Sequence, residues 1–566
     1  MDIADRLPRP VPLLLALTAV GLGLAGLGAC GGLYRPDVTP TPTRTPRPTA
    51  TPMPSPTPTP VWPVVLYLAP ELPADARIVL DEVVAQHTDR FALTTDPTLA
   101  DVRVELGTSD GEVVGEWFYA LAAPFPALDD GVAWADVVAA WRGEPAGEGF
   151  AFAARAPLMD AETQVALTAF LGPPGDDALS ILPADQLIDA AWADRPSWAI
   201  VPFHRLEPRW KVLRVDGQSV LTRGMQADVY PLRVPIAAAG LDRGVLALRE
   251  FLGDELTNRD EGRMTVLVMT GVTALTRGTA RTMEEQGVIY PAQDIGDWLR
   301  GADLTHVSNE VSFTPNCPVP PVQGGMVFCS HDRYIELLEA VDVEIVELTG
   351  NHLSDYGTEP LIHSLQMFQE RGWRWFGGGT DLAEATRPLT VTLESNRLAF
   401  VGCNSFGPEN AWAMEDSPGA APCDWGALRA QVTNLRASGW LPIATVQGYE
   451  TYEYFPTPQQ AMDFQALAEA GAVVVQGSQA HQPQGFGFHG GGFIHYGLGN
   501  LFFDQMQSLG TRQEFLDRHV FYDGRHISVE LLTAMLEEYA RPRPMTGEER
   551  RALLEAVFAA SDWAEE

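Results

Sequence analysis

The stretch from Val343 to Gly357 decides the fold, and it reads Val-Glu-Ile-Val-Glu-Leu-Thr-Gly-Asn-His-Leu-Ser-Asp-Tyr-Gly. Its first half is largely apolar and β-branched, which predicts a buried strand that ends at Thr349-Gly350. From Thr358 onward the apolar residues follow a helical spacing, at Leu361, Leu365, Met367 and Phe368. A strand that passes through a short loop into a helix is the repeating unit of α/β proteins.

The loop between this strand and this helix carries Asn351, His352 and Asp355. Because α/β proteins bind ligands outside the carboxyl ends of their strands, an amide, an imidazole and a carboxylate at this point can ligate a metal or move a proton. The alternative interpretation is a capped turn, in which Asn351 and Asp355 bond the backbone and His352 fills space. Polar residues at similar positions further along the chain favour a site.

Length and composition limit the domain organisation and the partners that can be expected for this chain. With 566 residues, 46% of them hydrophobic, the chain is expected to form two folded domains with appendages rather than one core. Its 38 basic and 74 acidic residues give a net charge of −36. A field of that sign repels nucleic-acid phosphates and anionic membrane surfaces, so we expect no nucleic-acid partner.

The amino terminus has the pattern of a processing signal over residues 1–30. A basic start is followed by an apolar stretch from Val11 to Leu27 and then by Leu27-Gly28-Ala29-Cys30. This tetrapeptide resembles the bacterial lipoprotein box, which implies a lipid on Cys30 and an exported protein anchored on the outer face of the bacterial cytoplasmic membrane. The alternatives are an ordinary signal peptide and a single membrane anchor.

The remaining chain divides by composition. Residues 31–63 are rich in Pro and Thr and predict an extended linker. Residues 64–240 alternate strand and helix patterns, which indicates an α/β domain whose layout resembles bacterial periplasmic substrate-binding proteins. Residues 241–262 predict a charged connecting helix, 263–546 a second α/β domain and 547–566 a terminal helix. The prolines of Arg541-Pro542-Arg543-Pro544 are expected to break the strand before that helix.

Four of the five cysteines form two local pairs, Cys317 with Cys329 and Cys403 with Cys423. Each pair lies in loop-like sequence rich in Pro or Gly. In an exported chain this spacing favours two disulfides that each close a loop. Another pairing or a zinc site stays open, although the spacing contains no Cys-x-x-Cys motif.

Within the second domain, polar residues follow several other predicted strands. They are Asn309 and Glu310 after residues 302–308, Gln447 and Glu450 after 441–446, and Gln479 and His481 after 473–476. Polar groups just beyond successive strands are the layout of a site at one edge of a sheet. His495 lies within a strand pattern and is assigned a structural role.

These segments resemble the CapA family of poly-γ-glutamate synthesis proteins, a branch of the calcineurin-like metallophosphatases. The resemblance covers roughly residues 264–545, and its most specific matches are Asn351-His352 with Asp355-Tyr356-Gly357, and Tyr496-Gly497-Leu498-Gly499-Asn500. It implies a four-layer sandwich, with helices outside two packed sheets, and a metal site at the strand ends. It also implies a role in the synthesis, anchoring or trimming of an anionic surface polymer.

The chain departs from the family pattern at the positions that bind metal. The family's Gly-Asp is Gly271-Val272 here, and two of its histidines correspond to Gln447 and Gln479. Because a two-metal centre needs a bridging carboxylate and several anionic or imidazole ligands, we do not expect a full dinuclear site. The prediction is one divalent ion (Mn, Fe or Zn) or none, with the ligands Glu310, His352 and His481, and with Asn309, Gln447 and Gln479 nearby.

Two functions follow from the resemblance. In the first, the chain is a metal-dependent hydrolase of the metallophosphatase type, with Asn351, His352, Asp355 and Glu450 as the catalytic residues. In the second, it is a non-catalytic binding or scaffold lipoprotein whose metal site has degenerated. The expected partners are an anionic surface polymer or a small ligand, and the membrane through the lipid anchor.

Overall fold

A computed structural model describes residues 63–107, 111–145, 147, 152, 155–318, 326–561 and 563, and Val64–Glu566 form one compact unit. The predicted signal segment, Cys30 and the Pro/Thr-rich linker lie outside the described residues, apart from Pro63. Within the described ranges, no helix combines the length and the apolarity needed to cross a bilayer.

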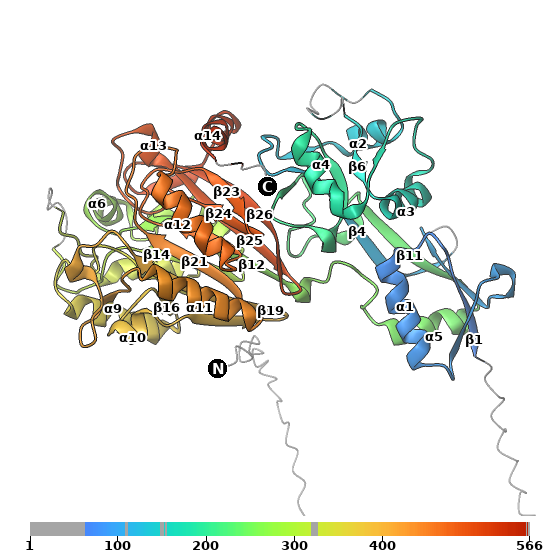
Figure 1. The fold of residues 1–566 in the computed structure, drawn as a ribbon, viewed down its shortest axis with the longest axis horizontal. Coiled ribbons are helices and arrows are strands. Elements are labelled where there is room, and N and C mark those ends of the chain that lie inside the picture. Colours follow the sequence, from blue (N-terminus) through green and yellow to red (C-terminus); the bar gives the residue numbers. More distant parts are fainter. Residues whose placement is uncertain are drawn as a thin grey trace, which may run out of the picture. The chain divides into compact units, whose positions relative to one another are not determined.

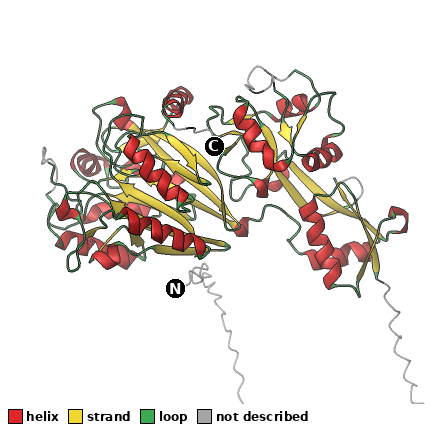
Figure 2. Ribbon diagram, in the orientation of Figure 1, coloured by secondary structure: helices red, strands yellow, loops and turns green. Residues whose placement is uncertain are grey.

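The first segment, from β1 to α5, is an α/β unit, as the alternating pattern predicted, and contains a nine-stranded mixed sheet. Figures 1 and 2 show its helices beside its strands. Its order is β2-β1-β3-β11-β4-β8-β6-β7, and β9 pairs with β4. The strands are β1 Val64–Leu68, β2 Phe91–Thr94, β3 Val102–Leu106, β4 Glu112–Pro124, β6 Leu158–Met159, β7 Ser180–Ile181, β8 Ala199–Pro202, β9 Trp210–Val212 and β11 Arg233–Gly240. A separate small pair joins β5 Gly131–Val132 to β10 Arg214–Val215. The helices are α1 Ala74–Gln86, α2 Trp134–Trp141, α3 Ala161–Leu171, α4 Leu187–Ala193 and α5 Asp242–Leu252.

The second segment, from β12 to α14, contains a sheet of eight strands and a sheet of six strands. The eight-stranded sheet runs β16-β15-β14-β12-β25-β26-β27, with β13 paired to β14, and the six-stranded sheet runs β18-β19-β21-β22-β24-β23. The strands of the first are β12 Met264–Thr270, β13 Val272–Thr273, β14 Leu304–Asn309, β15 Ile345–Glu347, β16 Arg374–Phe376, β25 Gln513–Tyr522, β26 Arg525–Glu537 and β27 Arg541–Pro544. Those of the second are β18 Leu389–Leu393, β19 Asn396–Asn404, β21 Leu441–Gln447, β22 Val474–Gly477, β23 Phe486–His489 and β24 Gly492–His495. The short strands β17 Gly378–Gly379 and β20 Gly419–Ala420 pair with each other.

Three apolar clusters stack these elements into four layers. One cluster lies between the two sheets and includes Phe376, Phe400 and Phe493. A second joins the eight-stranded sheet to α6 Arg277–Gln286, α7 Gly296–Arg300, α8 Ile335–Ala340 and α9 Glu359–Arg371. A third joins the six-stranded sheet to α11 Trp425–Ala437 and α12 Pro458–Glu469. This is the helix–sheet–sheet–helix sandwich that the family resemblance implied. The remaining helices are α10 Leu382–Ala385, α13 Leu509–Arg512 and α14 Gly547–Ala559.

The expectation for residues 541–544 was wrong. These residues form β27, whose Pro542 and Pro544 lie opposite Leu536 and Ala534 of β26. Proline has no backbone N–H to donate to a neighbouring strand. Because β27 is the last strand of its sheet, it has a neighbour on one side only, and edge strands tolerate proline for this reason. The connecting helix also ends earlier than predicted, at Leu252.

Both predicted disulfides are present, Cys317–Cys329 and Cys403–Cys423. The division at residues 240–263 stays a prediction. Strands on either side of it pair within their own sheets, yet Phe203 and Tyr522 belong to the same apolar cluster.

Candidate functional site

The predicted site residues follow the carboxyl ends of four parallel strands, β14, β15, β21 and β22. The loop after β15 packs directly on the loop after β14, and this contact depends on Gly350. A Cβ atom at that position would lie 2.6 Å from the Cα of Glu310, which is closer than real Cβ atoms approach. The glycine therefore brings Asn351 and His352 beside Glu310.

Glu310, His352 and Asp355 form one buried group. His352 Nδ1 lies 2.7 Å from Asp355 Oδ2, and His352 Nε2 lies 3.7 Å from Glu310 Oε1. Asp355 also accepts the backbone N–H of Phe328 at 2.7 Å, and the Phe328 ring lies 4.3 Å from the imidazole. Among the described atoms, Glu310 Oε2 has no hydrogen-bond partner although it is buried. The imidazole is thus held by one carboxylate and directed at another.

Opposing effects act on the pKa of His352. Burial lowers it, whereas the hydrogen bond to Asp355 and the charges of Glu310 and Asp355 raise it, and the net pKa lies above its usual value. Arg277, which is ion-paired with Asp504, opposes the increase. Without a bound cation, the carboxylates therefore favour an imidazolium at this position.

A second group consists of carboxamides. Gln447 Nε2 donates to Gln479 Oε1 and, at 3.4 Å, to Asn351 Oδ1. Gln479 Nε2 in turn lies 3.5 Å from Glu450 Oε2. Because Asn351 and His352 are adjacent in the chain, the two groups share one edge of the sandwich. Gln447 and Gln479 stand at positions where the family resemblance implies metal-binding histidines.

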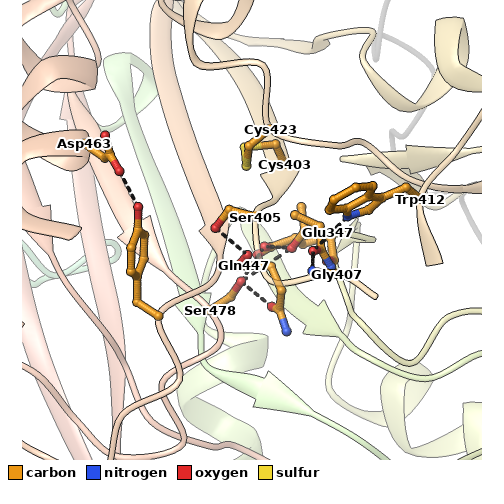
Figure 3. Close-up of a disulfide and its surroundings, with 12 residues drawn as sticks. Glu347, Cys403, Ser405, Gly407, Trp412, Cys423, Gln447, Asp463 and Ser478 are labelled. Atoms are coloured by element: carbon orange, nitrogen blue, oxygen red, sulfur yellow. Dashed lines mark hydrogen bonds between the residues drawn. A yellow bond between two sulfur atoms is a disulfide. The ribbon is translucent and has the colours of Figure 1, made fainter. Parts of the chain in front are cut away.

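Sequence reasoning missed Glu347 and Ser478, which are hydrogen-bonded to each other and, through Ser478, to the carboxamide group. The Ser478 hydroxyl is 2.9 Å from Glu347 Oε1 and 2.7 Å from Gln447 Oε1 (Figure 3). Burial raises the pKa of Glu347. The neighbouring His306, Thr349 and Ser478 lower it by more than burial raises it, so the net pKa lies below its usual value. The signal that could have identified it is a carboxylate within an otherwise apolar, fully buried strand.

His481 lies in a third group. Its Nδ1 is 2.9 Å from Asn500 Oδ1, and its ring stacks on Tyr452 at 6.5 Å between centroids. Tyr452 donates to Glu450 at 2.8 Å, and burial together with this bond raises the pKa of Tyr452 to about 12. The charge of Glu310 contributes to the same increase in the pKa of Tyr452.

The donor set does not fit a two-metal centre. Val272, at the position of the family's aspartate, is buried in an apolar cluster with Ala274, Val311, Phe328 and Phe503. Across the residues that the structure describes, no group of three or more His, Cys, Asp and Glu is arranged to hold a metal ion. A single cation fits better, because Glu310 Oε2 and the buried Oδ1 of Asn309 have no partner among the described atoms and His352 Nε2 faces Glu310. An imidazole whose other nitrogen bonds a carboxylate is the usual form of a metal-binding histidine.

Residues 266–505 match the family model described as bacterial capsule synthesis protein PGA_cap. Capsule biosynthesis protein CapA of Bacillus anthracis is 20% identical over 295 residues, which are 51% of this chain and 71% of that protein. PGA biosynthesis protein CapA of Bacillus subtilis is 22% identical over 172 residues, 30% of this chain and 45% of that protein. A solved 5'-nucleotidase precursor from Thermus thermophilus is 13% identical with a TM-score of 0.29, covering 51% of this chain and 58% of that one, a likeness too weak to carry an argument.

Proposed function

Because residues 266–505 belong to the PGA_cap family of bacterial capsule synthesis proteins, we propose that this chain acts at the cell envelope in making, retaining or trimming an anionic polymer such as poly-γ-glutamate. The names of its Bacillus relatives, a capsule biosynthesis protein and a PGA biosynthesis protein, support this proposal. The chain spans less than half of the second relative, so the activity of the whole relative is part of the proposal.

One observation carries a hydrolytic role, namely the buried Glu310–His352–Asp355 group. Glu310 and His352 would hold one divalent cation (Mn, Fe or Zn), with Asn309 as an added oxygen donor. The third predicted ligand, His481, lies in the separate group with Asn500 and Tyr452. Such a cation would supply Lewis-acid chemistry for hydrolysis. The reaction proposed is hydrolysis of an amide or phosphoester bond.

The chain's own residues have distinct parts in this reaction. Asp355 fixes the ring orientation of His352 through the bond to Nδ1. Asn351, Gln447 and Gln479 offer both amide donors and amide acceptors, which match the peptide-like links of a polyglutamate chain. Glu450, which is exposed at the rim, can accept or return a proton.

The metal content of the purified protein tests the hydrolytic role. Native protein is expected to contain one equivalent of manganese, iron or zinc, and His352→Ala is expected to lose it. The Asp332-bonded His363 offers a control, because His363→Ala changes a histidine–aspartate pair outside the site. Metal-free native protein whose melting temperature does not change on addition of these ions would exclude the metal-dependent reaction.

A second candidate function is binding without catalysis. It is favoured by the carboxamides at Gln447 and Gln479, since neutral amides replace imidazole and carboxylate ligands poorly. In this case the site binds the polymer or a small ligand, and the first segment captures a ligand or serves as a scaffold. This function would be supported if the metal-free native protein binds the polymer without changing its length. Gln447→Ala should then lose this binding.

Localisation completes the proposal. The sequence Leu27-Gly28-Ala29-Cys30 supports export and a lipid anchor on the outer face of the bacterial cytoplasmic membrane. The net charge of −36 supports a protein with no nucleic-acid partner. In cells, Cys30→Ser is expected to move the protein from the membrane fraction to the soluble fraction. Unchanged membrane association of this variant would contradict the lipid anchor.

A further inference from the structure

The interior of the sandwich contains a row of polar side chains where a β-sandwich normally has only apolar ones. In the six-stranded sheet, Thr445 pairs with Gln476 and Gln476 pairs with His495, so the three lie side by side on neighbouring strands. Their alternate neighbours Ile443, Val474 and Phe493 belong to the apolar cluster between the sheets, which places the polar row on the same inner face.

The eight-stranded sheet presents matching groups across this space. His306 lies two residues beyond Leu304, and Asp517 two residues beyond Phe515, and both of these apolar residues belong to the cluster between the sheets. His495 Nδ1 bonds Asp517 Oδ2 at 2.6 Å and thereby links the two sheets directly. We call Thr445, Gln476, His495, His306 and Asp517 the buried polar row.

Each member of the row is buried and has an unsatisfied polar atom. Among the described atoms, these atoms have no hydrogen-bond partner: Thr445 Oγ1, Gln476 Oε1, His495 Nε2, His306 Nδ1 and Asp517 Oδ1. Leaving a buried donor or acceptor unpaired costs a sizeable part of a protein's net stability, and native interiors rarely contain several together. Such groups acquire partners from internal water when the space is polar and each water finds several of them.

We propose that the buried polar row binds a cluster of internal water molecules that hydrogen-bond across the two sheets. Among the described residues, the unpaired atoms of Thr445, Gln476 and His495 lie on neighbouring strands, and His495 reaches Asp517 of the other sheet, so a water in the row has several polar groups to bond. A buried cation fits less well, because no three-residue His, Cys, Asp and Glu group arranged for metal occurs among the described residues.

The row also reaches the candidate site. His306 Nε2 lies 3.2 Å from Glu347 Oε2, and Glu347 Oε1 lies 2.9 Å from the Ser478 hydroxyl, which contacts Gln447. Water in the row thus lies next to a carboxylate that supports the carboxamide group. This inference does not depend on the proposed function, because it concerns the interior and not the substrate.

The isosteric substitution Thr445→Val distinguishes a hydrated row from a dry one. If the hydroxyl is bonded to water, its loss removes a hydrogen bond and the melting temperature of the full-length protein falls. If the row is dry, the substitution removes an unpaired polar atom and the melting temperature rises. Thr305→Val is the matched control, since the Thr305 hydroxyl donates to the Leu299 carbonyl at 2.8 Å and its loss must lower the melting temperature.

A high-resolution crystal structure of the native protein gives the second measurement. Ordered water within hydrogen-bonding distance of Gln476 and His306, together with a lower melting temperature for Thr445→Val, is the expected result. Either an interior without solvent density at these atoms, or a Thr445→Val protein at least as stable as the native one, would overturn the inference.

Discussion

Asp355 is the residue whose contribution can be isolated most cleanly. Asp355 bonds His352 Nδ1 and leaves Nε2 directed at Glu310, so it orients the imidazole ring without itself binding the proposed cation. Removing such a supporting carboxylate typically weakens metal binding by about 10–100-fold. Asp355→Asn, which keeps an oxygen for the Phe328 N–H, is therefore expected to weaken Mn²⁺ binding by roughly that factor in calorimetric titration.

Asp332→Asn is the control for this change. Asp332 lies 2.9 Å from His363 Nε2, in a pair of the same type outside the site. Its substitution should leave Mn²⁺ affinity unchanged. Equal affinities for the native protein and Asp355→Asn would contradict the role assigned to Asp355.

His526 gives a pH-dependent prediction. Burial lowers its pKa from 6.5 to about 4, although backbone bonds near Ser528 and Val473 oppose the change. Between pH 6.5 and pH 4, His526 is therefore protonated in the unfolded chain and neutral in the folded chain. The folded state loses stability as the pH falls through this range. At about 1.4 kcal/mol per unit, the stability of His526→Gln relative to native protein should rise by roughly 3 kcal/mol between pH 7 and pH 4. Denaturant unfolding at both pH values measures this difference, and a difference that does not change with pH would contradict the shift.

At this scale the positions after strands predicted a site that contains Glu310, Asn351, His352, Gln447, Gln479 and His481, and their roles stay a prediction. It could not show which of them touch, because the partners are far apart in the chain, as Gln447 and Gln479 are. Glu347 was missed because the apolar neighbours Ile345 and Val346 made the segment look like an ordinary core strand. The contacts with His306 on β14 and with Ser478 after β22 show why a carboxylate is tolerated there.

The loops that follow β14 and β15 are the elements on which the site depends. Gly350→Ala would place a Cβ 2.6 Å from Glu310 Cα and 2.7 Å from its carbonyl oxygen, so the two loops must separate. We expect a loss of about 1–3 kcal/mol in the free energy of unfolding, together with weaker Mn²⁺ binding.

Gly547→Ala is the control for Gly350→Ala, because it is the same substitution at a position with free space. Gly547 begins α14, and a Cβ atom added at this position would have no described atom within 4 Å. Alanine should be neutral or stabilising by up to about 1 kcal/mol, with Mn²⁺ binding unchanged. If Gly350→Ala behaved like Gly547→Ala in both assays, the close packing of the two loops would be refuted.

The Cys317–Cys329 disulfide supports the same region. It closes a loop with a sequence separation of 12, and Cys329 is adjacent to Phe328, whose N–H bonds Asp355. Replacing both cysteines by serine should lower the free energy of unfolding by about 3 kcal/mol and weaken Mn²⁺ binding as well. Denaturant unfolding with the Cys403–Cys423 bond intact measures the first effect. Unchanged Mn²⁺ affinity would show that the loop does not support the site.

Most elements could be predicted from periodicity, because their apolar patterns are long. The strand predicted before Thr349-Gly350 is β15, Ile345–Glu347, and the helix predicted from Thr358 is α9, Glu359–Arg371. The error at Arg541–Pro544 arose because a single sequence does not reveal which strand lies at the edge of a sheet, where proline is tolerated.

At the scale of the whole molecule, the α/β class and the sandwich of the second segment could be predicted, while the connections between the sheets could not. The His495–Asp517 bond and the contacts of Gln447 arise only when strands of two sheets meet. The family resemblance predicted where along the chain a site lies, and the departures at Val272, Gln447 and Gln479 argued against a two-metal centre from the sequence alone.

Polymer hydrolysis measures the proposed function most directly. Full-length protein is incubated with poly-γ-glutamate and one equivalent of Mn²⁺, and polymer length is followed by size-exclusion chromatography, with His352→Ala and His363→Ala in parallel. Native protein and His363→Ala should shorten the polymer, while His352→Ala should leave it intact. Polymer of unchanged length with all three proteins would contradict a hydrolytic site built on Glu310, His352 and Asp355.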